Sequence, residues 1–142
     1  MWMKEQGQAI IEFAIIIPFF ILFLVGAFVL TMLFYNWMAL STMTRDAARM
    51  ASLSPSCTTE DIVSMYTGTN TSSVHLPNLI GAQGFYTWDA ASDASAVQLA
   101  SINNGEGISV TMTAKRAKNY QWLPATIQCQ TSMHLQNTAS SQ

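Results

Sequence analysis

The sequence predicts an α+β protein: a long N-terminal membrane-spanning helix whose C-terminal half packs on a small antiparallel β-sheet domain. Three observations lead to this fold class. Residues 13–35 read FAIIIPFFILFLVGAFVLTMLFY, and about 20 apolar residues are enough to cross a bilayer as a helix. Small and apolar residues then recur at helical spacing as far as Leu53. Finally, residues 108–114 and 127–135 alternate apolar and polar positions, as half-buried strands do.

The first element is a helix expected over residues 8–53, with the membrane segment at about 13–35. A secretory signal has an apolar part of only about 7–15 residues and ends at a small-residue cleavage site, so this longer run is expected to stay in the mature chain. Pro18 lies inside it and predicts a kink, because proline removes a helical hydrogen bond. Tyr35 and Trp37 stand where apolar residues give way to polar ones, as interfacial aromatic anchors do.

Beyond the membrane segment the helix becomes amphipathic. A stripe of mostly small residues is expected to receive the exported domain: Trp37, Leu40, Thr44, Ala47, Ala48 and Ala51. Arg45 and Arg49 share another face, which we interpret as solvated in preference to a contact with a neighbouring subunit.

Glu12 interrupts the apolar character at the start of the membrane segment. An ionisable residue there is costly and marks a functional hypothesis. No cation is within helical reach, because Lys4 lies eight residues upstream and the two arginines of the helix more than thirty downstream. Cleavage after Gly7 would free the amine of Gln8, whose pKa near 8 leaves it mostly charged at neutral pH. That amine could meet Glu12 of a neighbouring helix.

These residues carry a family resemblance. Gly7, four residues, then Glu12-Phe13 before an apolar helix resembles the class III signal of type IV prepilins. The finer pattern GQAIIEFAIIIPFFILFL, with Pro18 six residues after the glutamate, resembles the TadE-like minor pilins, or pseudopilins, of tight-adherence (Tad) pili. The segment RDAARMA at residues 45–51 is similar to the end of the long helix in that family. The likeness covers about the first third of the chain.

The resemblance implies a pilin-like fold and a history for the chain. Residues 1–7 would be a cytoplasmic leader, cut between Gly7 and Gln8 by an aspartic-type prepilin peptidase, and Glu12 and Phe13 would set the register of the subunit during assembly. The partners implied are this peptidase, major and minor pilins, the inner-membrane assembly platform and the lipid bilayer. The chain would start in the bacterial inner membrane, with its N-terminus cytoplasmic, and continue to the periplasm or the extracellular pilus.

The function expected is therefore assembly of a Tad-type adhesive pilus, by priming, capping or decorating it. The major-subunit role is less favoured, because major pilins of such systems are typically little more than the helix. The alternative is a single-pass accessory protein of a secretion or envelope complex that never polymerises, with Glu12 merely near the headgroups. An enzyme is a distant third, because no catalytic constellation, phosphate loop or carboxylate pair is apparent, and no cofactor is expected.

Residues 54–142 are expected to form one small domain of about 90 residues. The sequence Ser54-Pro55-Ser56 ends the long helix, and Thr58 to Asp61 reads as the cap of a short helix to about Tyr66. The remaining interpretations follow the chain: a loop over 67–78, core aromatic residues rather than an adhesive patch at Phe85, Tyr86 and Trp88, a helix over 90–102, a turn over 103–107, and a basic, aromatic connection over 115–124.

Cys57 and Cys129 both follow the membrane segment, and a pair in an exported domain favours a disulfide. It would close a loop of about 72 residues and add roughly 4 kcal/mol to stability on the chain-entropy model. No metal site is expected, because His75 and His134 lack a zinc-like spacing. The net charge of −2 and the lack of a basic patch argue against nucleic acid. Charge does not fix the membrane orientation, since basic residues flank both sides.

Overall fold

The computed structural model describes residues 2–54, 56–67, 74–75, 85–90, 93, 95–102 and 105–135, with side chains from Ile10 onward except those of Thr67, Val74 and His75. The chain divides into two compact units, Met1–Phe34 and Tyr35–Gln142. The division falls at the predicted end of the apolar run, and each unit is described below by itself.

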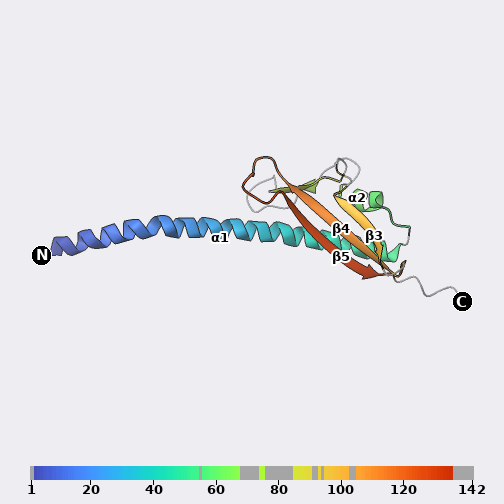
Figure 1. Cartoon of the computed structure of the whole chain (residues 1–142), viewed down its shortest axis with the longest axis horizontal. Helices are drawn as coiled ribbons and strands as arrows, with labels where there is room; N and C mark the ends of the chain where they lie inside the picture. The colour runs from blue at the N-terminus through green and yellow to red at the C-terminus, as the bar shows by residue number, and fades with distance from the viewer. Residues whose placement is uncertain are drawn as a thin grey trace. The chain divides into compact units, whose positions relative to one another are not determined.

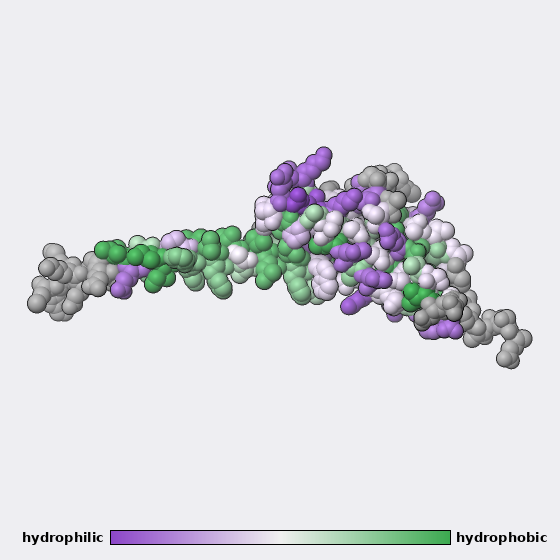
Figure 2. Space-filling model, in the orientation of Figure 1, coloured by the Kyte–Doolittle hydropathy of each residue, from purple (hydrophilic) through white to green (hydrophobic). Residues whose placement is uncertain are grey.

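Helix α1 (Trp2–Leu53) runs without interruption through 52 residues, so it begins before the predicted Gln8 and ends at the predicted residue. Pro18 lies inside it, with helical residues on both sides. From Ile10 to Phe28 the apolar side chains of the first unit are exposed all round, Phe23 for example being 71% exposed, and Figure 2 shows this surface in green. A helix that is apolar on every side is suited to lipid. Within the described residues, α1 is the one helix long and apolar enough to cross a membrane.

The second unit holds an antiparallel sheet built around one central strand, which confirms the predicted α+β class (Figure 1). The strands are β1 (Val74–His75), β2 (Tyr86–Trp88), β3 (Val97–Ile102), β4 (Gly107–Arg116) and β5 (Thr126–His134). Strand β5 pairs with β4 along one edge. The other edge of β4 is shared, since β3 pairs with Gly107 to Met112 and β2 pairs with Lys115 and Arg116. Strand β1 lies outside β2.

Both strands expected from alternation are present, with the predicted faces. On β5, Ile127 and Cys129 are buried while Gln128 and Gln130 are exposed. The partners of the buried pair on β4, Ala114 and Met112, are also buried, so the inner face is continuous across the two strands. On the outer face Gln130 donates a hydrogen bond to the Ser109 hydroxyl at 2.9 Å.

The helix predicted over residues 90–102 is wrong, because Val97 to Ile102 form strand β3. Val97 and Leu99 pair with Met112 and Val110 of β4, and these partners lie beyond the turn. The helical periodicity of the segment was weak, so pairing with a neighbouring strand decided its conformation. His75 was likewise expected in a loop but lies in β1, opposite Thr87.

The C-terminal part of α1 buries a stripe of small and medium-sized side chains in the second unit. Its fully buried members are Asn36, Leu40, Thr44, Ala47, Ala48 and Ala51. Trp37, predicted to belong to the stripe, is 43% exposed, and the neighbouring Asn36 is buried in its place. The arginines at 45 and 49 are exposed, as a solvated face requires.

Helix α2 (Thr59–Thr67) forms where the cap was predicted. The Thr58 hydroxyl accepts a hydrogen bond from the Asp61 amide, and the Asp61 carboxylate accepts one from the Thr58 amide at 2.8 Å. This reciprocal arrangement satisfies backbone donors that the first turn of a helix leaves without partners. These hydrogen bonds hold the pKa of Asp61 below its usual range.

Candidate functional site

The five residues singled out at the N-terminus lie on one helix. Gly7 and Gln8 are helical, and their side chains lie outside the described residues. Glu12 lies four residues after Gln8, so the backbone nitrogen of Gln8 is one turn from Glu12 on the same face. Phe13 is 66% exposed. From Gly7 to Pro18 the helix rises about 17 Å, so the structure keeps these residues within three to four turns.

Glu12 is exposed, and among the described side chains it forms no ion pair. Its carboxylate and the apolar side chains around it are therefore open to a neighbouring helix or to lipid. A charge in this position favours a cationic partner, because a lipid or helix-bundle environment screens it far less than water does.

The predicted disulfide is absent from this structure, where Cys57 and Cys129 are both free thiols. The disulfide between them therefore stays a prediction. Burial, with a smaller effect of the Asp61 charge, raises the pKa of the Cys57 thiol.

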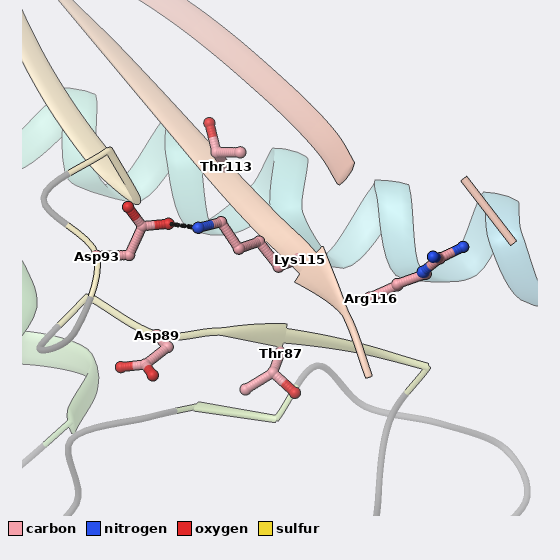
Figure 3. A pocket seen from close by; sticks show the side chains of 6 residues that line it. All are labelled: Thr87, Asp89, Asp93, Thr113, Lys115 and Arg116. Carbon is pink, nitrogen blue, oxygen red and sulfur yellow. Dashed lines mark ion pairs between the residues drawn. The ribbon is translucent and has the colours of Figure 1, made fainter. Parts of the chain in front are cut away.

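A polar pocket lies on the outer face of the sheet, lined by Thr87, Asp89, Asp93, Thr113, Lys115 and Arg116 (Figure 3). Asp93 and Lys115 point toward each other and form an ion pair, whereas Arg116 points away from this ion pair. The Asp93 carboxylate also accepts hydrogen bonds from the amide and hydroxyl of Ser95. The Lys115 contact first and the Ser95 bonds next lower the pKa of Asp93 to about 2.

Three charged side chains that line this pocket bind groups of the protein itself. Asp93 uses its oxygens on Ser95 and Lys115, and Arg116 donates to backbone carbonyls of the following loop. The arrangement therefore braces the segment before β3 against β4. Among the described residues, no three His, Cys, Asp or Glu side chains gather closely enough to hold a metal ion. His134 is exposed on the outer face.

The sequence interpretation gave no role to the loop between β4 and β5, residues 117–125, beyond noting its basic and aromatic character. In the structure it is an ordered hairpin connection that exposes Trp122. The signal that could have indicated a surface is the clustering of Lys115, Arg116 and Lys118 beside Tyr120 and Trp122.

One helix able to cross a membrane, followed by a small α+β unit with a sheet of five strands, defines the general class of this protein. The comparison with protein families then identifies the N-terminal part: residues 7–49 match the family described as TadE-like protein. This confirms the predicted resemblance over about a third of the chain, the part that contains Gly7, Glu12, Phe13 and Pro18. No curated protein and no solved structure matches the chain.

Proposed function

We propose that this protein is a minor pilin or pseudopilin, cut after Gly7 by a prepilin peptidase, that takes part in the assembly of a Tad-type adhesive pilus. One observation carries the proposal. Gly7, Glu12, Phe13 and Pro18 occur in register on a helix with an exposed apolar surface, inside the segment that matches the TadE-like family. The exported unit would then prime, cap or decorate the filament.

The chemistry of assembly follows from charge and burial. Before cleavage the chain is inserted with residues 1–7 in the cytoplasm. Hydrolysis of the Gly7–Gln8 bond leaves a Gln8 amine that is mostly protonated at neutral pH. When such helices pack side by side, this cation pairs with Glu12 of a neighbour, so neither charge remains alone in a poorly screened environment. The exposed apolar side chains around Phe13 provide the packing surface.

The partners that this proposal requires are the prepilin peptidase, other major and minor pilins, the inner-membrane assembly platform and the lipid bilayer. The chain would begin in the bacterial inner membrane with its N-terminus cytoplasmic. It would then expose the second unit to the periplasm or carry it into the extracellular pilus. No enzymatic activity and no cofactor form part of the proposal.

The second candidate function is a permanently anchored accessory protein of a secretion or envelope complex. The observation that favours it is the helical conformation of α1 through Gly7 and Gln8. Proteolysis generally selects exposed, loop-like backbone, so the Gly7–Gln8 bond would have to unwind before cleavage. In an uncut chain, Glu12 would lie near the headgroups.

The deciding experiment determines the N-terminal residue of the full chain recovered from membranes of cells with a working prepilin peptidase. The native chain is compared with Gly7→Val and with Gly26→Ala, a control at a glycine of α1 that has open space around it. We expect a start at Gln8 in the native chain and the control, and an uncut chain for Gly7→Val. An intact Met1 or Trp2 in the native chain would exclude the pilin reading and leave the accessory anchor.

Glu12 is tested in the same cells with Glu12→Gln, which keeps size and polarity but removes the charge. We expect this variant to be cut normally and to be lost from the sheared filament fraction, because the Gln8 amine has no carboxylate to pair with. Equal amounts of the native chain and Glu12→Gln in filaments would show that the charge does not register the subunit.

A further inference from the structure

The loop at residues 117–125 presents an unusual exposed aromatic residue. Outside α1, Trp122 is the most exposed large apolar side chain among the described residues, at 60%. Two aromatic residues of the sheet behave differently, since Tyr86 and Trp88 are fully buried. An exposed tryptophan is costly in water and common at surfaces that meet a partner or the interface of a membrane.

The loop holds Trp122 in a fixed place. The Arg116 guanidinium donates hydrogen bonds to the carbonyl oxygens of Gln121, at 2.5 Å, and Leu123, at 2.8 Å. The Tyr86 hydroxyl donates to the Pro124 carbonyl oxygen at 3.0 Å. Because both side chains come from the sheet, the loop is tied to the sheet at three points around Trp122.

Ring contacts support the same geometry. The Phe85 ring meets the Tyr120 ring edge-on, with centroids 4.6 Å apart, and meets the Trp122 ring at 6.4 Å. The exposed indole therefore rests on one flank against an aromatic ring and presents the rest of its surface outward. Little side-chain entropy remains to be lost when a partner covers it.

The charged side chains of residues 115–126 are all basic. Three of the six basic residues of the whole chain are Lys115, Arg116 and Lys118, and residues 115–126 contain no acid. Lys115 is engaged by Asp93, and Arg116 by the carbonyls of the loop. Lys118 is exposed and forms no ion pair among the described side chains. The loop thus combines an aromatic surface with an available cation.

The loop lies at the end of the second unit where α1 enters it. Leu53, the end of α1, lines one pocket together with Met133 near the end of β5. From there α1 leads back to Tyr35 over about 27 Å, and β5 leads back to the loop over about 26 Å. In Figure 1 the loop that joins β4 and β5 lies at the opposite end of this hairpin from the C-terminal end of α1. Trp122 and the interfacial pair Tyr35 and Trp37 therefore belong to the same end.

We propose that the loop at residues 117–125 docks on the lipid headgroup surface beside the point where α1 leaves the membrane. Trp122 enters the interfacial layer, as aromatic residues of membrane proteins do, and Lys118 faces anionic headgroups. The contact would give the exported unit a second attachment to the bilayer and fix its orientation before assembly. This inference depends on the membrane-spanning part of the proposed function, and not on cleavage or polymerisation.

The test uses tryptophan quenching in the full chain. The substitutions Trp2→Phe and Trp37→Phe leave Trp88, which is buried, and Trp122 as the emitting residues. The protein is reconstituted in nanodiscs of phosphatidylcholine and phosphatidylglycerol, with or without bromine near the top of the acyl chains. We expect bromine to reduce the emission, and Trp122→Phe to abolish that reduction while leaving the emission of Trp88 as an internal check of folding.

Lys118→Gln serves as the matched test of charge. We expect it to weaken the quenching of Trp122 in nanodiscs with phosphatidylglycerol and to change nothing in phosphatidylcholine alone. If the quenching depends on phosphatidylglycerol to the same extent with Lys118 and with Lys118→Gln, the role of Lys118 is overturned.

Two outcomes would overturn the inference in different ways. Bromine-insensitive emission from a chain that comigrates with the nanodisc would show that Trp122 stays out of the lipid, and the proposed function would stand. If that emission shifted with protein concentration, a second copy of the chain would be the partner instead. A chain that failed to enter the nanodisc would refute the membrane segment, and with it both the inference and the proposed function.

Discussion

Tyr66 connects three elements of the second unit through one side chain. Its hydroxyl donates a hydrogen bond to the Met43 carbonyl oxygen of α1 at 2.9 Å. Its ring meets Trp88 of β2 edge-on, with centroids 5.8 Å apart. Trp88 in turn donates from Nε1 to the Ala96 carbonyl oxygen at 3.0 Å. The neutral phenol therefore holds α2 against both α1 and the sheet.

This contact predicts a loss of stability at high pH. Burial, reinforced by the Asp46 charge, raises the pKa of Tyr66 from 10.0 to about 12. Because the folded protein holds the phenolic proton more tightly than the unfolded chain, the contribution is fully present below pH 10 and is lost as the pH rises through about 12. Tyr66→Phe should remove this part of the pH dependence and cost about 1 kcal/mol at neutral pH through the lost hydrogen bond.

The measurement is urea unfolding of the full chain in detergent micelles, at neutral pH and at increasing alkaline pH. Tyr86→Phe is the matched control, since the Tyr86 hydroxyl also makes a hydrogen bond and burial also raises its pKa. The control should keep the part of the pH dependence that belongs to Tyr66. If alkaline pH lowers the unfolding free energy of Tyr66→Phe and of the native chain by the same amount, the loss of stability arises from a group other than Tyr66.

At the scale of residues, the sequence predicted burial better than it predicted partners. Tyr86 and Trp88 were expected in the core, because large aromatic residues in a small domain seldom have another place. The bond from Tyr66 to Met43 could not be predicted, since it joins residues 23 positions apart on two helices whose packing is tertiary. The error between Asn36 and Trp37 arose because both residues lie about one turn before Leu40, so that spacing alone does not choose between them.

At the scale of elements, the buried stripe of α1 depends on small side chains. Ala47, Ala48 and Ala51 are completely buried, which lets the rest of the unit approach the helix closely. Ala48→Leu should therefore destabilise the second unit by about 1–3 kcal/mol, because a well-packed site must shift to admit a larger side chain. Thr42→Leu on the exposed face of the same helix should stay within about 0.5 kcal/mol. Equal unfolding midpoints for the two variants would mean that the stripe is loosely packed.

The junction of β3, β4 and β5 depends on the absence of a side chain at Gly107. A Cβ there would lie 2.8 Å from Cγ1 of Ile102 and 3.2 Å from the Met133 carbonyl oxygen. The carbonyl belongs to the paired strand and cannot rotate away. Gly107→Ala should thus cost about 1–3 kcal/mol in urea unfolding. Gly26→Ala adds the same methyl group to open space in the first unit and should leave the unfolding of the sheet unchanged.

The elements differed in how far their own sequence determined them. Strands β4 and β5 each bury one face, so the alternation of Val110, Met112 and Ala114, and of Ile127 and Cys129, indicated both the strands and their inner faces. Strand β3 has only Val97 fully enclosed on its alternating positions, so its local pattern was ambiguous. Its conformation depends on the pairing with β4, and the sequence of residues 90–102 alone carries no information about that pairing.

At the scale of the whole molecule, the composition of α1 assigns two environments to one helix. The apolar residues from Ile10 to Phe28 are exposed all round, whereas the stripe from Asn36 onward is buried. The sequence predicted this change from the end of the apolar run. It also indicated the family resemblance of the first part, because the pattern from Gly7 to Pro18 is local and lies inside the segment that matches the TadE-like family. The sequence of the second unit contains no such pattern. The exposure of Trp122, and its place at one end of the sheet, became apparent only from the fold.

Pro18 tests whether the two environments are independent. Proline leaves the Ala14 carbonyl oxygen without its helical partner, and Pro18→Ala restores that hydrogen bond. Pro18 lies about 26 Å along the helix from Tyr35, so the unfolding free energy of the second unit should change by less than about 0.5 kcal/mol.

If a bend at Pro18 helps the subunit leave the bilayer, Pro18→Ala should accumulate in membranes and be depleted from sheared filaments. Gly26→Ala, which stiffens the same helix without repairing a hydrogen bond, is the control. Native amounts of Pro18→Ala in filaments would show that the proline is inert in assembly, and a destabilised second unit would show that the two parts of the chain are coupled.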